Sequence, residues 1–432
     1  MKNYWAFSLR ASRRLSGFAV NVLLLAAASL VLMPATIGAA GLETWSSIVL
    51  GQALGLIVQT VAGLGYGVNG PAIVATQSLD DGVSYFCLAQ RARLVVAVPC
   101  FASMAIAMFL IPNPDPVVGI LGGAHLAIGS FTAQFFYVGR AAPLWQLVAE
   151  TAPRATLMLA GALSLYMGAP LVFGLSLPAL GAVLAVVTST ASIVRSAGTQ
   201  NARRRSSGFS EVRAELWGRR GPIAASALRG GRDALPVLLV TAVATAELVG
   251  TFGVFERIQR QIVGALIPVV STLQGWVPRR IAIEKTARPA VTALLASCAG
   301  APVIVLLFAW VGPPLVWWLS AKKVTPTLAE ISLCGSFIAT SLLIQVIAYA
   351  CLVPLGGIRD VVKSDIAGVL CVLVGVPVVS ILQPSVASVL GALVAGNVIQ
   401  ILMQIILMRR SIVRQAYLVP IQSVKDQELE AR

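Results

Sequence analysis

Long apolar runs, separated by short clusters of charge, are the feature that most constrains what this chain can fold into. Of its 432 residues, 57% are hydrophobic and only 11% are charged, whereas a soluble domain carries about 25% charged residues. A run of roughly 18 or more apolar residues is long enough to cross the hydrocarbon core of a bilayer as a helix. The pattern therefore predicts an all-α polytopic membrane protein.

Twelve transmembrane helices can be drawn along the chain, with ends that are certain to about 2–4 residues. They run near residues 17–40, 45–68, 92–111, 116–138, 144–167, 171–194, 234–252, 257–277, 290–311, 328–353, 365–382 and 386–408. The predicted organisation is a cytoplasmic N-terminal segment (1–16), a first six-helix bundle (17–194), a basic cytoplasmic linker (195–233), a second six-helix bundle (234–408) and a cytoplasmic tail (409–432).

The formal net charge of +15 would suggest a nucleic-acid partner in a soluble protein. With twelve spans and both termini in the cytoplasm, however, the Lys and Arg residues outside the spans fall on the cytoplasmic side, except Lys322 and Lys323. This bias is the positive-inside pattern of a multi-pass protein of the cytoplasmic (inner) membrane, and no nucleic-acid partner is expected. The arginine-rich linker either binds anionic membrane lipids or only sets this orientation.

One pair of charges lies within a predicted span. Arg154 sits near the middle of the fifth span, where an arginine costs roughly 2.5–3.5 kcal/mol on insertion scales. Glu150 precedes it by four residues, so both side chains share one helix face. The pair is either a self-neutralised contact that fixes helix packing or a charged wall of a water-filled cavity.

The stretch "LVGTFGVFERIQRQIVGALIP" (248–268) carries further charge inside apolar sequence. We expect a helical hairpin here, with a tight outer turn near Gly253 between the seventh and eighth spans. Arg257 and Arg260 would open the eighth span and face roughly one way, within reach of Glu247 and beside Glu256. They either snorkel to the outer interface or recognise phosphate, which suits the planar fork of arginine.

Two amides are candidate polar residues of the twelfth span. Gln400 and Gln404 are four residues apart and share a helix face. Amides in lipid usually hydrogen-bond between helices. In a cavity they would instead meet the hydroxyl groups of a ligand.

No catalytic set is apparent in the sequence. The chain has no GxxxxGK[ST] loop, a single histidine (His125) and six cysteines without CxxC spacing. We therefore expect no catalytic residues, no metal site and no cofactor, and a protein that is not an enzyme.

Three segments resemble the polysaccharide flippases of the MATE-like MOP transporter superfamily. They are "GLETWSSIVLGQALGLIVQTVAGLGYGVNGPAIVA" (41–75), "FYVGRAAPLWQLVAETAPRA" (136–155) and "LVGTFGVFERIQRQIVGALIPVVSTLQGWVPRR" (248–280). The resemblance implies two six-helix bundles around a central cavity. It also implies a cargo of lipid-linked oligosaccharide, carried on undecaprenyl diphosphate and flipped by alternating access for polysaccharide export.

The same resemblance implies the site residues and partners. Arg154, Arg257 and Arg260 match the positions of cavity arginines that meet the anionic cargo, and Glu150, Glu247 and Glu256 would pair with them or couple transport to H⁺ or Na⁺. A polysaccharide polymerase or a glycosyltransferase is a possible protein partner. A multidrug exporter of the same superfamily, a membrane-embedded glycan-modifying enzyme and a scaffold without transport remain as alternatives.

Overall fold

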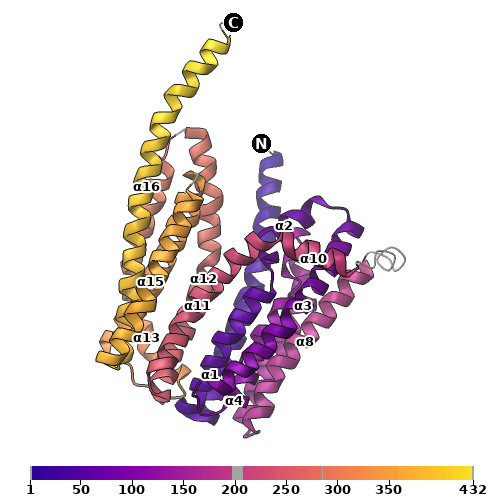
Figure 1. Ribbon diagram of the computed structural model, residues 1–432, viewed down its shortest axis with the longest axis vertical. Coiled ribbons are helices and arrows are strands. Elements are labelled where there is room, and N and C mark those ends of the chain that lie inside the picture. The colour runs from indigo at the N-terminus through magenta and orange to yellow at the C-terminus, as the bar shows by residue number, and fades with distance from the viewer. Residues whose placement is uncertain (1, 197–207, 285, 356, 431–432) are drawn as a thin grey trace. The chain divides into compact units, whose positions relative to one another are not determined.

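The computed structural model describes residues 2–196, 208–284, 286–355 and 357–430, and each regular element within these ranges is a helix (Figure 1). Contacts divide the chain into two compact units. The first comprises Met1–Val254 and Trp317–Val324, and the second comprises Phe255–Val316 and Thr325–Arg432. The all-α membrane fold predicted from the apolar runs is confirmed.

The first unit is built on a long N-terminal helix. Its elements are α1 (Lys2–Ala62), α2 (Tyr66–Thr76), α3 (Leu79–Leu110), α4 (Pro116–Ile128), the 3₁₀ turn η1 (Gly129–Phe131), α5 (Gln134–Gly139), α6 (Pro143–Gln146), the π-helix η2 (Leu147–Thr151), α7 (Ala152–Tyr166), α8 (Leu171–Ser196), α10 (Phe209–Gly218), α11 (Arg220–Val243) and the start of α12 (Ala246–Glu284). Gly41 interrupts α1 with φ 79° and ψ 169°, a backbone conformation that glycine adopts readily. The first two predicted spans meet at this kink.

Glycines bring α1 and α4 into close contact. A methyl group built on Gly51 of α1 would lie 1.8 Å from the carbonyl oxygen of Gly119 on α4, and one on Gly55 would lie 2.4 Å from that of Gly123. The two helices thus meet through glycines spaced four apart on each side. Such spacing lets helix backbones approach closely in lipid, where packing drives association.

The prediction of a hairpin turn near Gly253 is wrong. The chain turns earlier, where α11 ends at Val243 and Ala244 adopts an extended conformation with φ −115° and ψ 164°. The next helix, α12, then runs without interruption through Gly253. The seventh span therefore lies in α11, and the eighth lies in α12.

The glycines near the expected turn have a packing role instead. A Cβ atom on Gly250 would lie 2.2 Å from the carbonyl oxygen of Leu42, and one on Gly253 would lie 2.4 Å from Cγ2 of Val49. Both glycines let the start of α12 pack directly on α1. A glycine within an apolar helix marks a close approach here, not a turn.

The second unit contains the rest of α12, most of α13 (Arg288–Leu319), α14 (Leu328–Gln345), the π-helix η3 (Val346–Leu352), the 3₁₀ turn η4 (Val353–Leu355), α15 (Ile358–Leu382) and α16 (Val386–Glu430). Thr327 and Glu330 form a capping box at the start of α14, which satisfies backbone N–H groups that have no partner within the helix. Neighbouring α15 and α16 pack along their length (Figure 1).

Nine helices within the described ranges are long and apolar enough to cross a membrane. The difference from the twelve predicted spans has a simple origin. The first two predicted spans are joined across Gly41 and count as one helix. The fifth span is divided among α6, η2 and α7, each of which is too short to be counted. The seventh span lies in α11, whose first turns carry too many charged residues for the helix to be counted as apolar.

The predicted linker is largely helical where it is described. Its residues from 208 onward form α10 and the first turns of α11, and contacts group both helices with the first unit. The arginine triplet at 203–205 lies outside the described residues. The predicted boundaries of the two six-helix bundles remain a prediction.

Candidate functional site

Glu150 lies in a π-helical turn, which widens the helix by one residue. The turn, η2, leads directly into α7. The wider turn alters the α-helical pattern of hydrogen bonds, and the Ala149 carbonyl accepts a hydrogen bond from the Thr188 hydroxyl of α8. Such π-turns occur often at functional sites because they re-aim the side chains around them.

The carboxylate of Glu150 is held between two elements. Its Oε1 atom accepts a hydrogen bond from the hydroxyl of Thr132, where the chain breaks between η1 and α5. The same Oε1 lies 4.0 Å from Nη1 of Arg154, one helical turn later. The side chains of Glu150 and Arg154 are only 6% and 16% exposed, so this pair is an intramembrane ion pair at the limit of contact distance.

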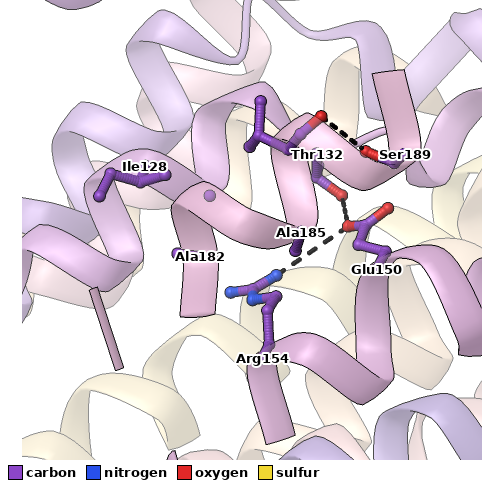
Figure 2. Close-up of a pocket in the computed structure, with 9 residues that line it drawn as sticks. Ile128, Thr132, Glu150, Arg154, Ala182, Ala185 and Ser189 are labelled. Atoms are coloured by element: carbon purple, nitrogen blue, oxygen red, sulfur yellow. Dashed lines mark hydrogen bonds and ion pairs between the residues drawn. The ribbon is translucent and has the colours of Figure 1, made fainter. Parts of the chain in front are cut away.

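These side chains line a small cavity within the first unit (Figure 2). Its volume is about 10 Å³, which is room for about one water molecule. Arg154 and Glu150 point toward each other beside the apolar wall formed by α8 (Figure 2). The lining consists of Ile128, Gly129, Thr132, Glu150, Arg154, Ala182, Ala185, Val186 and Ser189.

A second arginine adjoins this pair. Arg93 of α3 is 2% exposed, and its Nη1 donates a 2.8 Å hydrogen bond to the carbonyl oxygen of Thr132. Its charge is also within electrostatic reach of Glu150. The cluster of Arg93, Glu150 and Arg154 therefore contains two arginines and one carboxylate.

The charges of α12 form a separate cluster. Glu256 and Arg260 are one helical turn apart and form an ion pair, and Arg257 is buried at 6% exposure. Glu247 lies in the first turn of the same helix, about 15 Å along the axis from Arg257 at 1.5 Å per residue. The expected approach of Glu247 to the two arginines is therefore wrong, because α12 is continuous.

The two glutamines of α16 are fully buried and bond to α15. Nε2 of Gln400 donates a 2.6 Å hydrogen bond to Oδ1 of Asp365, and Nε2 of Gln404 donates a 3.3 Å bond to the hydroxyl of Ser364. The expected hydrogen bonding between helices is confirmed. A role of these amides in ligand binding remains a prediction.

Sequence reasoning missed Arg93 and Arg219 as buried residues. Arg93 stands in a basic stretch at the very start of the predicted third span, and Arg219 stands in the predicted linker, yet Arg219 is only 5% exposed. The aromatic pairs at 85–86 and 135–136 were the available signal, because clustered aromatic rings attract guanidinium groups.

The comparisons with known proteins identify solved structures of similar fold. No protein-family model matches the sequence, and a search of curated proteins finds no relative. Among solved structures, an inward-facing multidrug resistance MATE family transporter of the MOP superfamily is 13% identical, with a TM-score of 0.66 over 92% of this chain and 99% of that one.

Two further structures are similar in fold. The lipid II flippase MurJ in an inward closed conformation is 9% identical, with a TM-score of 0.58 over 98% of this chain and 93% of that one. A MOP superfamily transporter from Pyrococcus furiosus, noted for the reverse polarity of its binding pocket, is 14% identical, with a TM-score of 0.53 over 93% and 95%. These neighbours are transporters and not enzymes. The fold of the chain is similar to that of these MATE and MOP superfamily transporters over more than nine-tenths of its length.

Proposed function

We propose that the chain is a flippase that moves a lipid-linked oligosaccharide, carried on undecaprenyl diphosphate, across the cytoplasmic membrane by alternating access. The observation that supports this most directly is an excess of positive charge in the buried cluster of the first unit. Two arginines, Arg93 and Arg154, lie there with one carboxylate, Glu150. A second group of charges on α12 brings Arg257 and Arg260 beside Glu256.

A diphosphate group would offset the net positive charge of such a cluster. The Arg154 guanidinium meets the Glu150 carboxylate at 4.0 Å, while the same carboxylate oxygen accepts the Thr132 hydroxyl. The arginine is thus incompletely neutralised, although a charge at membrane depth is costly. Arginine binds phosphate oxygens through two parallel N–H groups, so an anionic cargo is the ligand class that this arrangement favours.

The small cavity limits what Arg154 can contact directly. A volume of about 10 Å³ admits about one water and no sugar ring. The head group would therefore lie outside this cavity, with Arg154 supplying one contact to its phosphates. Glu150, whose buried Oε2 accepts no hydrogen bond from the described residues, is the carboxylate that we propose for coupling to H⁺ or Na⁺.

Binding of matched probes tests the proposed cargo. Purified protein in lipid nanodiscs would be titrated with a fluorescent polyprenyl-diphosphate sugar and, separately, with the cation ethidium. We expect the wild type to prefer the diphosphate. Arg154→Ala, and separately Arg257→Ala with Arg260→Ala, should weaken binding by about tenfold or more, the equivalent of one charge-assisted hydrogen bond.

Arg280→Ala is the matched control, because it removes the same charge from an exposed helix position, where Arg280 pairs with Glu284 and lies over the Trp276 ring. It should bind as the wild type does. Equal affinity of all variants for the diphosphate probe would show that these arginines are not part of the binding site. A preference of the wild type for ethidium would overturn the proposed cargo.

A multidrug exporter is the second candidate, supported by the similarity to the MATE multidrug transporter. Cargo of that kind is commonly cationic and would need unpaired carboxylates. The arginine excess around Glu150 argues against it. Sensitivity of a deletion strain to toxic cations, restored by the wild-type gene, would favour the exporter.

The cellular setting of the proposed flippase follows from its cargo. We propose a cytoplasmic-membrane location with both termini in the cytoplasm, contact with membrane lipids, and a polysaccharide polymerase or glycosyltransferase as a functional partner. The distribution of basic residues supports this orientation. Reporter fusions at both termini would test it.

A further inference from the structure

Arg219, at the junction of α10 and α11, is buried in a set of specific contacts. Its Nη1 donates a 3.0 Å hydrogen bond to Oδ1 of Asn69, its Nη2 donates to the hydroxyl of Tyr85, and its Nε pairs with Glu215 one turn earlier. The guanidinium carbon also lies 3.6 Å from the ring centre of Tyr66. Arg219 is thus bound to α2 and α3 through its two terminal nitrogens, while its third nitrogen binds Glu215 of α10.

This arrangement is not expected of a basic residue in a solvated connection. Such an arginine normally keeps its guanidinium in water, because burying the charge is costly unless its donors are matched. Here the planar fork meets an amide oxygen, a phenol and a carboxylate. Tyr66 also donates a 3.0 Å hydrogen bond to Glu215, so the carboxylate and the ring hold the same arginine.

The backbone that follows Arg219 also packs closely against the end of α1 and the start of α2. Gly65 precedes α2 with φ 66°, and a Cβ atom there would lie 2.7 Å from Pro222 of α11. Further along α11, a Cβ atom on Gly230 would lie 2.2 Å from the hydroxyl of Thr60. The connecting segment is therefore packed against the end of α1 and the start of α2, both beside Arg219 and eleven residues beyond it.

The contacts continue from Tyr66 to the charged cavity. The Tyr66 ring centre is also 4.9 Å from the guanidinium carbon of Arg93. Arg93 donates to the carbonyl oxygen of Thr132, and the Thr132 hydroxyl donates to Glu150. A chain of direct contacts thus runs from the connecting segment to the buried carboxylate.

We propose that Arg219 is a positioning residue, which holds the α10–α11 segment on α2 and α3 and, through Tyr66 and Arg93, holds Thr132 in place beside Glu150. The α10–α11 segment would then help to position residues of the candidate site, in addition to connecting α8 to α12. Its importance for transport rests on the proposed function. The contact chain itself can be tested without any cargo.

Hydrogen–deuterium exchange of the full-length protein in nanodiscs tests the contact chain. In Arg219→Ala we expect exchange to rise by about tenfold in α10, because charge-assisted hydrogen bonds are lost. We also expect exchange to rise about threefold in residues 129–139, which contain Thr132, because a weaker cation–π contact transmits the change. Arg219→Lys, which keeps the charge but not the fork, should fall between this variant and the wild type.

The control is Arg220→Ala, which removes the neighbouring, exposed arginine that stacks on Trp217. It should leave exchange in both segments unchanged. Faster exchange confined to α10 in Arg219→Ala, or no change in either segment, would overturn the proposal. Should Arg219→Ala fail to fold, Tyr85→Phe removes one acceptor while keeping the ring, and the same two segments decide the outcome. Failure of the diphosphate to bind would refute the proposed cargo without altering this exchange pattern.

Discussion

Replacing Gly51 by alanine tests the close contact between α1 and α4. The added methyl group would lie 1.8 Å from the carbonyl oxygen of Gly119, and that oxygen belongs to the backbone and cannot rotate away. An ordinary carbon–oxygen contact needs about 3.5 Å, so the helices must separate by well over an ångström. Overpacking of this kind costs about 1–3 kcal/mol, which exceeds the gain of about 1 kcal/mol in helix propensity.

Because the clash is with backbone, the upper end of this range applies, and the expected result is a net loss of about 2 kcal/mol in the free energy of unfolding. It would be measured by thermal and denaturant unfolding in detergent, followed by tryptophan fluorescence. Gly264→Ala is the matched control, because nothing lies within 4 Å of a Cβ atom at that position of α12. It should stabilise the protein or leave it unchanged. A Gly51→Ala protein as stable as the wild type would refute the proposed backbone contact.

Two smaller perturbations test the second unit. Thr327→Ala removes the capping box formed with Glu330 and should cost about 1 kcal/mol, seen as faster hydrogen exchange in the first turn of α14; unchanged exchange there would contradict it. Asn397→Leu removes hydrogen bonds of 3.0 Å to Thr340 and 3.2 Å to Ser341. At about 0.6 kcal/mol per bond in a membrane protein, it should lower the free energy of unfolding by about 1 kcal/mol, and an unchanged melting temperature would show that these bonds contribute nothing.

The features that could be predicted from the sequence are those that depend on the spacing of residues close together along the chain. The apolar runs indicated the membrane spans, and the interval of four between Glu150 and Arg154 placed both side chains on one helix face, where the structure pairs them. The same rule places Glu256 beside Arg260. These contacts depend only on helical geometry, so no knowledge of the tertiary fold was needed.

The errors concern contacts between distant segments. Gly253 was interpreted as a turn because glycine is common in turns, whereas its lack of a side chain is used here for packing against Val49. The buried position of Arg219 depends on Asn69 and Tyr85, which are more than 130 residues away in sequence. No local pattern specifies which aromatic ring such an arginine will meet.

The number of residues in the π-turn before α7 sets how α6 is turned around the helix axis relative to Arg154. A π-turn contains one residue more than an α-turn, and each residue of an α-helix advances about 100° around its axis. Deleting Val148 from η2 would therefore turn the preceding helix by about that angle relative to Arg154, with no change in the chemical character of the site. A homologue with one residue fewer at this point would have α6 turned relative to the cavity, even if its arginine and glutamate were unchanged.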